Sequence, residues 1–187
     1  MKLARTISII GHPLLLGSLY VILMSFHNLP NQTAMAVSLS VICLITVPIV
    51  LNNWRKTKKG TYTNFDVSDQ QQRKGFYPFA ITLFIVLLLV FWVFDFPKEV
   101  ISKSLLFFAM VLLMALINLR LKASMHAGIA FYIAVSVFSI GLWPGIILLV
   151  LALLISWSRL EMKRHSLFEL IVGGFLGFVF GWLSLFV

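Results

Sequence analysis

The chain has 187 residues, of which 60% are hydrophobic and 11% are charged, and its mean hydropathy is +1.01. A soluble domain is about half apolar and about a quarter charged, so this composition excludes a soluble globular protein and predicts an integral membrane protein. The single cysteine, Cys43, excludes an internal disulfide and a cysteine-based metal cluster.

Seven apolar stretches are candidate membrane-spanning helices, because a helix needs about 17–25 apolar residues to cross a bilayer. The basic start resembles a signal peptide but lacks a small-residue cleavage site, so we expect a retained first helix. Gly141, Pro144 and Gly145 predict a turn between the fifth and sixth stretches, which are both short; the alternative is one kinked helix. The sequence therefore predicts an all-α polytopic membrane helix bundle of six to seven spans, forming a single domain over residues 1–187. The stretches are about 8–26, 33–52, 77–95, 100–118, 125–141, 143–158 and 166–187.

Basic residues are concentrated in the loops that seven spans would place on one side of the membrane. These loops hold thirteen Lys and Arg residues, whereas the opposite side holds only Lys98 and Lys103. Such a bias predicts that the basic loops and the N-terminus are cytoplasmic. The net charge of +9 then reflects topology and attraction to anionic headgroups, and no nucleic-acid partner is expected. The basic loops are residues 1–7, 53–76, 119–124 and 159–165.

Three of these loops carry side chains suited to phosphate. Arginine donates two parallel hydrogen bonds from a planar fork, and helix N-termini near residues 124 and 165 would aim backbone N–H groups at an anion. In the first loop, Ser68 and Gln71 fit a capping box, which predicts a helix start there. The candidate residues are Arg73 and Lys74 in the first loop, Lys122, Ser124 and His126 in the second, and Ser158, Arg159, His165 and Glu169 in the third.

Glu169 is the most informative of these residues, because a carboxylate inside an apolar span is costly and needs a partner. On a helix it lies beside His165, four residues earlier. A carboxylate in that place holds one imidazole nitrogen protonated and leaves the other as a nucleophile. His126 is then a candidate to protonate a leaving alkoxide.

The stretch "SRLEMKRHSLFE", residues 158–169, is similar to the third signature of the PAP2 (type 2 phosphatidic acid phosphatase) superfamily. That signature is Ser-Arg, five residues, His, three residues, Asp, and Glu169 takes the aspartate place. The second signature, Pro-Ser-Gly-His, is represented by "ASMH" at residues 123–126. The first signature is Lys, six residues, Arg-Pro. Only its arginine is present, as Arg73. Asp66 stands in the lysine place and Lys74 in the proline place. The resemblance covers about residues 64–187, and "GHPLL" at 11–15 is similar to an opening seen in some bacterial members.

The resemblance implies a lipid phosphate or diphosphate phosphatase of a bacterial plasma membrane, working through a phosphohistidine without a metal or other cofactor. His165 would attack phosphorus, Glu169 would orient it and His126 would protonate the leaving group. The implied phosphate-binding set is Arg73, Ser124, Ser158 and Arg159, with Lys74 or Lys122 replacing the missing lysine. The expected partners are a lipid phosphate substrate and membrane lipids.

Two alternatives remain open at this point. The first is a catalytically degenerate PAP2-like protein that binds an anionic lipid phosphate without turnover, which the altered signatures favour. The second is a small transporter, which would need polar residues along a path in mid-membrane. The spans disfavour it, because apart from Glu169 they have almost none there. Two other patterns have structural interpretations. His12 before Pro13 predicts a helix start near the headgroups, and Gly173, Gly177 and Gly181 predict close helix packing.

Overall fold

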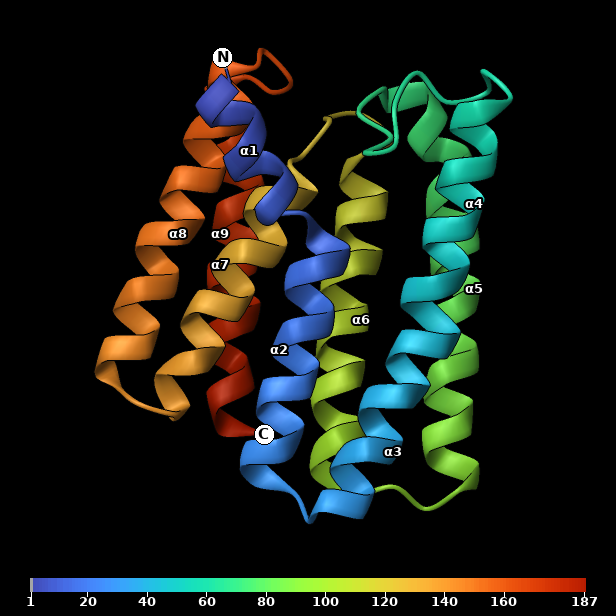
Figure 1. The fold of residues 1–187 in the computed structure, drawn as a ribbon, viewed down its shortest axis with the longest axis vertical. Helices are drawn as coiled ribbons and strands as arrows, with labels where there is room; N and C mark the ends of the chain where they lie inside the picture. Colours follow the sequence, from blue (N-terminus) through green and yellow to red (C-terminus); the bar gives the residue numbers. More distant parts are fainter. Residues whose placement is uncertain (1) are drawn as a thin grey trace. The chain divides into compact units, whose positions relative to one another are not determined.

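The structure is a computed structural model that describes residues 2–187, and over these residues it contains helices and no β-strand (Figure 1). The all-α prediction is therefore confirmed. The chain divides into two compact units. The terminal unit combines the described residues up to Leu19 with Arg120–Val187, and the middle unit is Tyr20–Leu119. The division falls inside the second helix.

The α-helices are α1 (Lys2–Ile10), α2 (Pro13–Asn28), α3 (Asn31–Val41), α4 (Val47–Lys58), α5 (Gln70–Val93), α6 (Lys98–Ile117), α7 (Met125–Ser136), α8 (Leu142–Glu161) and α9 (Leu167–Leu183). A π-helical segment, Ile42–Thr46, joins α3 to α4, and short 3-10 turns, Val137–Ser139 and Ser184–Phe186, follow α7 and α9.

Within the described residues, five helices are long and apolar enough to cross a membrane, as expected for an integral membrane protein. They are Asn31–Lys58, α5, α6, α8 and α9 with its 3-10 turn, and α1 with α2 would make a sixth, bent by 42°. The seven stretches expected from the sequence differ from the structure at α7. This helix ends with its 3-10 turn at Ser139 and is shorter than a membrane span. Gly141 separates α7 from α8, as predicted, in place of one kinked helix.

Helix α7 forms the core of the terminal unit, where it packs against α8 and α9. Ten of its twelve residues are buried. A helix that is apolar on every side is stable when protein surrounds it, which explains why α7 does not need the length of a lipid-facing span. Four small residues, Ala127, Gly128, Ala130 and Ala134, let neighbouring helices approach α7 closely.

Glycines bring α9 into backbone contact with α7, confirming the predicted close packing. A Cβ atom at Gly173 would overlap the carbonyl oxygen of Ser124, and one at Gly177 would overlap that of Gly128. Small residues at four-residue spacing let two helices approach this closely. Farther along the pair, the buried hydroxyls of Ser136 and Ser184 are hydrogen-bonded at 2.6 Å.

The middle unit contains the second half of α2, the long helix Asn31–Lys58 and the helices α5 and α6. Pro48 has no N–H to donate to the carbonyl four residues earlier, and the π-helical segment just before it accommodates this loss. Helix α5 is capped by Asp69, whose carboxylate accepts from the N–H of Gln72 at 3.0 Å. The expected cap at Ser68 is therefore wrong by one residue. Gln70 donates to the carbonyl oxygen of Asn118 at 2.8 Å, which places the start of α5 beside the end of α6.

Candidate functional site

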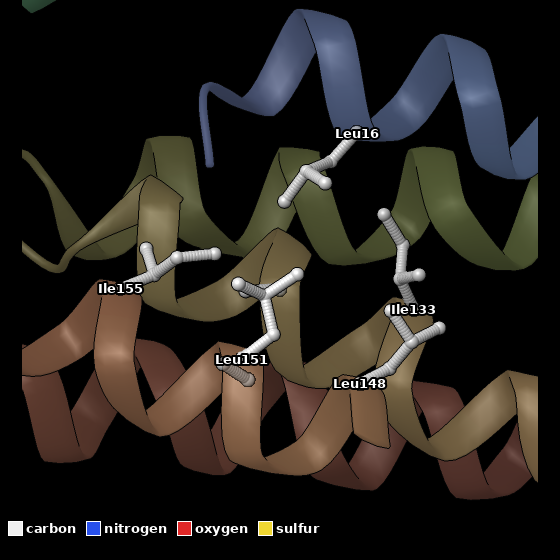
Figure 2. Close-up of a pocket in the computed structure, with 7 residues that line it drawn as sticks. Leu16, Ile133, Leu148, Leu151 and Ile155 are labelled. Carbon is white, nitrogen blue, oxygen red and sulfur yellow. The ribbon is translucent and has the colours of Figure 1, made fainter. Parts of the chain in front are cut away.

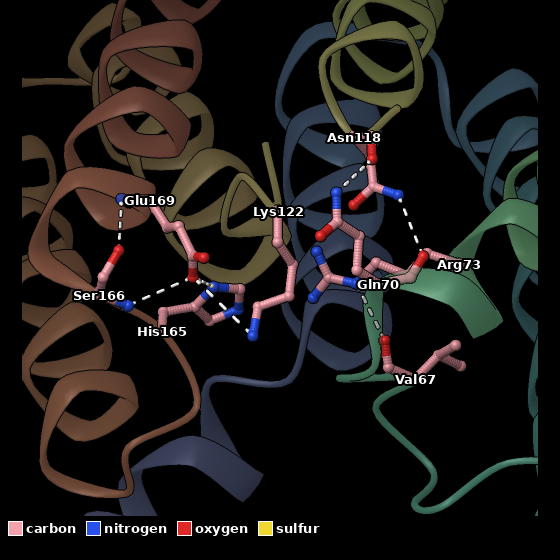
Figure 3. Close-up of polar contacts among 8 residues, drawn as sticks. All are labelled: Val67, Gln70, Arg73, Asn118, Lys122, His165, Ser166 and Glu169. Atoms are coloured by element: carbon pink, nitrogen blue, oxygen red, sulfur yellow. Dashed lines mark hydrogen bonds and ion pairs between the residues drawn. The ribbon is translucent and has the colours of Figure 1, made fainter. Parts of the chain in front are cut away.

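His165 and Glu169 form a hydrogen-bonded pair at the start of α9. Nδ1 of His165 lies 2.8 Å from Oε2 of Glu169, and the imidazole side chain is fully buried (Figure 3). Glu169 is fixed in turn by a capping box: its carboxylate accepts from the N–H of Ser166 at 3.2 Å, and its own N–H donates to the Ser166 hydroxyl at 3.3 Å. The positive end of the α9 dipole also favours a carboxylate there. The Ser-x-x-Glu pattern of this box is readable in the sequence, and our sequence analysis missed it.

The carboxylate determines which imidazole nitrogen of His165 carries the proton. Because an ionised carboxylate only accepts hydrogen bonds, Nδ1 of His165 is the donor, and in the neutral ring Nε2 keeps its lone pair. The i,i+4 contact predicted from the sequence is therefore present, with the geometry that would orient a nucleophilic imidazole.

The second candidate loop, before α7, contacts the third, before α9, at the pair of His165 and Glu169. The N–H of Ser124 donates to the carbonyl oxygen of Glu169 at 3.0 Å, and Nζ of Lys122 lies 3.9 Å from Oε2 of Glu169. The Ser124 hydroxyl caps α7 by accepting from the N–H of Ala127 at 3.4 Å. The start of α7 is thus bonded to the first turn of α9. His126, the second residue of α7, is buried there.

Arg159 is fully buried in the last turn of α8, where a cation needs partners. Its Nη1 donates to the hydroxyl of Ser8 in α1 at 2.7 Å, and its carbonyl oxygen accepts from the N–H of Arg164 at 3.0 Å, which turns the loop back toward His165. The neighbouring Ser158 hydroxyl donates to the carbonyl oxygen of Ile155 at 2.6 Å. Sequence reasoning did not find Ser8, because no local pattern signals a contact between residues 151 positions apart.

A second histidine pair involves His126 and His12. Their ring centroids are 5.5 Å apart and their planes are nearly perpendicular, at 83°. His12 precedes α2, as predicted, and its Nδ1 accepts from the N–H of Leu14 at 3.2 Å. From the sequence, His12 is expected only to mark a helix start, and the Gly11-His12-Pro13 break is the one local signal of a special position.

Arg73 and Lys74, the first-loop candidates, belong to the middle unit, whereas the other predicted residues belong to the terminal unit. Within the middle unit, Arg73 is buried and its Nε donates to the carbonyl oxygen of Val67 at 2.9 Å (Figure 3). Lys74 is exposed. Their contribution to a shared phosphate site stays a prediction.

An apolar crevice of about 10 Å³ lies one helical turn from Arg159 and His126 in the terminal unit (Figure 2). This volume is about that of one water molecule or methyl group, so we interpret the crevice as a packing gap between helices. Its lining residues are Leu16, Ala130, Ile133, Leu148, Leu151, Ala152 and Ile155.

Comparison with protein-family models, with curated proteins and with solved structures found no match to this chain. The chemistry of the site must therefore be argued from its own residues. A carboxylate-oriented imidazole, a second buried imidazole and a buried guanidinium at one end of three packed helices can bind an anion and can transfer protons.

Proposed function

We propose that the protein is a membrane-embedded phosphatase that hydrolyses a lipid phosphate or diphosphate through a phosphohistidine on His165. The observation that carries this proposal is the 2.8 Å contact between Nδ1 of His165 and the carboxylate of Glu169. A carboxylate bonded to Nδ1 leaves Nε2 as an oriented lone pair, which is the arrangement that a nucleophilic imidazole uses. The buried Arg159 and the partly buried Lys122 supply positive charge in the same unit.

In the proposed reaction, the lone pair on Nε2 of His165 forms a bond to phosphorus while the bond from phosphorus to the leaving oxygen breaks. His126 gives its proton to that oxygen, so a lipid phosphate leaves as a neutral alcohol and a lipid diphosphate leaves as the protonated lipid monophosphate. His126 then accepts a proton from water, and the resulting hydroxide attacks phosphorus. The phosphorus–nitrogen bond breaks, inorganic phosphate leaves and His165 is regenerated. The cations stabilise charge on the phosphoryl oxygens throughout.

A lipid is the substrate class that suits a chain of this composition. The candidate residues lie at helix ends, where an interfacial headgroup would meet them while its hydrocarbon chain stays in the bilayer. In the terminal unit, the bond of Ser124 to Glu169 joins the starts of α7 and α9, and the bond of Arg159 to Ser8 joins the end of α8 to the end of α1. We propose that the end of the unit that holds these bonds faces the cytoplasm of a bacterial cell, because the loops of the terminal unit before α7 and α9 are rich in Lys and Arg.

A second candidate function is binding of an anionic lipid phosphate without turnover. It is favoured by the altered signatures, in which Asp66 and Lys74 stand in the lysine and proline places of the first and Met125 stands in the glycine place of the second. In that case the same residues would serve recognition alone.

Phosphate release from a panel of lipid phosphates and diphosphates by the purified protein in detergent tests the proposal. We expect His165→Ala to lower the rate by at least about 10³-fold, because the nucleophile is lost. His27→Ala is the matched control: His27 is exposed in the middle unit and should leave the rate unchanged. Wild type should also yield an acid-labile phosphoprotein, and His165→Ala should yield none.

Two outcomes distinguish the candidates. If wild type and His165→Ala both release no phosphate but still bind the lipid, the binding function replaces the phosphatase. If His165→Ala hydrolyses as fast as wild type, the phosphohistidine mechanism is wrong.

A further inference from the structure

We propose that His12 is a positioning residue that holds the His126 imidazole in the orientation for proton transfer. This inference rests on the proposed function, in which His126 protonates the leaving oxygen. It starts from the perpendicular contact between the two rings, whose centroids are 5.5 Å apart. Both rings lie in the terminal unit, and His126 is only 3% exposed.

The chain places His12 with some precision. Helices α1 and α2 are separated at Gly11 and His12, and a Cβ atom at Gly11 would overlap the side chain of Ile155 in α8. The break is therefore packed directly against α8, one turn before Arg159. Pro13 follows as the first residue of α2, a position where the absence of an N–H is harmless. The backbone on both sides of His12 is thus constrained.

The ring of His12 is constrained as well. Because its Nδ1 accepts from the N–H of Leu14 at 3.2 Å, the proton of the neutral ring is on Nε2, and rotation of the ring would break this bond. His12 acts here as the N-cap of α2, with its carbonyl oxygen accepting from the N–H of Leu16 at 2.9 Å. A fixed ring packed against His126 limits the angles that the second imidazole can adopt.

Capping alone does not account for a histidine at this position. Asn, Asp and Ser are the preferred N-cap residues, and each would accept from the N–H of Leu14 with a smaller side chain. What an imidazole adds is the ring that contacts His126. General acid catalysis depends on holding the donor within hydrogen-bond reach of the leaving oxygen, so a looser His126 should transfer its proton less effectively.

The substitution His12→Asn separates the two roles, since asparagine keeps the cap and removes the ring. Its effect should depend on the leaving group. An alkyl phosphate leaves as a basic alkoxide that needs a proton, whereas p-nitrophenyl phosphate leaves as a weakly basic phenolate that does not. We expect His12→Asn to lower kcat for the alkyl phosphate about 10-fold, and kcat for p-nitrophenyl phosphate by less than about 2-fold.

A double-mutant cycle completes the test. If His12 acts through His126, adding His12→Asn to His126→Ala should cost no further activity on the alkyl phosphate. Thermal unfolding of His12→Asn and His12→Ala in detergent reports the capping role separately, and only the alanine variant should lose stability, by about 1 kcal/mol.

The outcomes separate this inference from the proposed function. If wild type hydrolyses both substrates and His12→Asn is as active as wild type on the alkyl phosphate, the positioning role is wrong and the phosphatase proposal survives. Equal losses on both substrates would also overturn the positioning role. If wild type hydrolyses neither substrate nor any lipid phosphate, the proposed function fails, and this inference fails with it.

Discussion

Two basic regions, the end of α8 in the terminal unit and the end of α4 in the middle unit, hold their cations in opposite environments. In the terminal unit, the Arg159 side chain is fully buried and donates to Ser8 at 2.7 Å. In the middle unit, at the end of α4, the ammonium groups of Lys58 and Lys56 lie over aromatic rings, 4.7 Å from the centroid of Trp54 and 5.0 Å from that of Tyr62. Lys58 and Trp54 are exposed.

This difference separates two uses of positive charge that the sequence alone does not distinguish. Removing a guanidinium from water costs several kcal/mol unless it is well paired, so a buried Arg159 needs a specific explanation. An exposed contact between a cation and an aromatic ring contributes about 0.5–1 kcal/mol, and a basic loop beside a membrane span is already explained by topology. The burial of a cation, rather than its place in a basic loop, therefore points to a functional role.

The largest loss of activity is expected from Glu169→Gln in the terminal unit. Glutamine at this position preserves the capping box with Ser166 but removes the charge that fixes the His165 tautomer. We expect phosphate release to fall by about 10³–10⁴-fold, because an amide at this position allows the wrong imidazole tautomer. The matched control is Glu161→Gln at the end of α8, where the side chain is exposed. Equal activity of both variants would mean that Glu169 serves only as a cap.

A smaller effect, on the stability of the terminal unit, is expected when α7 and α9 are forced apart. Gly177→Ala should destabilise the terminal unit by about 1–3 kcal/mol, because the added methyl group would overlap the backbone of Gly128 in α7. Gly17→Ala in α2 is the control, since nothing lies within 4 Å of a Cβ at that position. Because alanine is a better helix former than glycine, Gly17→Ala should leave the free energy of unfolding unchanged or raise it by up to about 1 kcal/mol. Thermal unfolding in detergent measures both, and equal melting temperatures would contradict the close approach of α7 and α9.

Local patterns in the sequence predicted the features that depend on neighbours along the chain. The contact between His165 and Glu169 follows from four-residue spacing on a helix, and the break at Gly141 follows from its Gly and Pro neighbours. The cap at Asp69 was placed one residue early because serine and aspartate are both good N-caps. The glycines of α9 correctly predicted close packing, although not which helix they would contact.

Contacts between distant segments could not be predicted in this way. The bond between Arg159 and Ser8 joins α8 to α1, and the rings of His12 and His126 join the start of α2 to the start of α7. Both depend on how helices pack, and a single sequence contains no periodic signal of that packing. The burial of α7 was missed for the same reason, because hydrophobicity does not distinguish a helix surrounded by protein from one that faces lipid.

The smallest effect is expected from Lys58→Ala in the middle unit. Loss of its contact with Trp54 should change the free energy of unfolding by less than about 1 kcal/mol. The separate variant Lys58→Arg should keep the contact. Phosphate release should be unchanged in both variants, since an exposed cation of this kind anchors the loop and does not meet the reacting phosphoryl group. Unfolding in low and high salt, with parallel activity assays, measures both properties. A loss of activity comparable to that of Glu169→Gln would instead assign a catalytic role to the α4 end of the middle unit, and burial would no longer distinguish the functional cations from the topological ones.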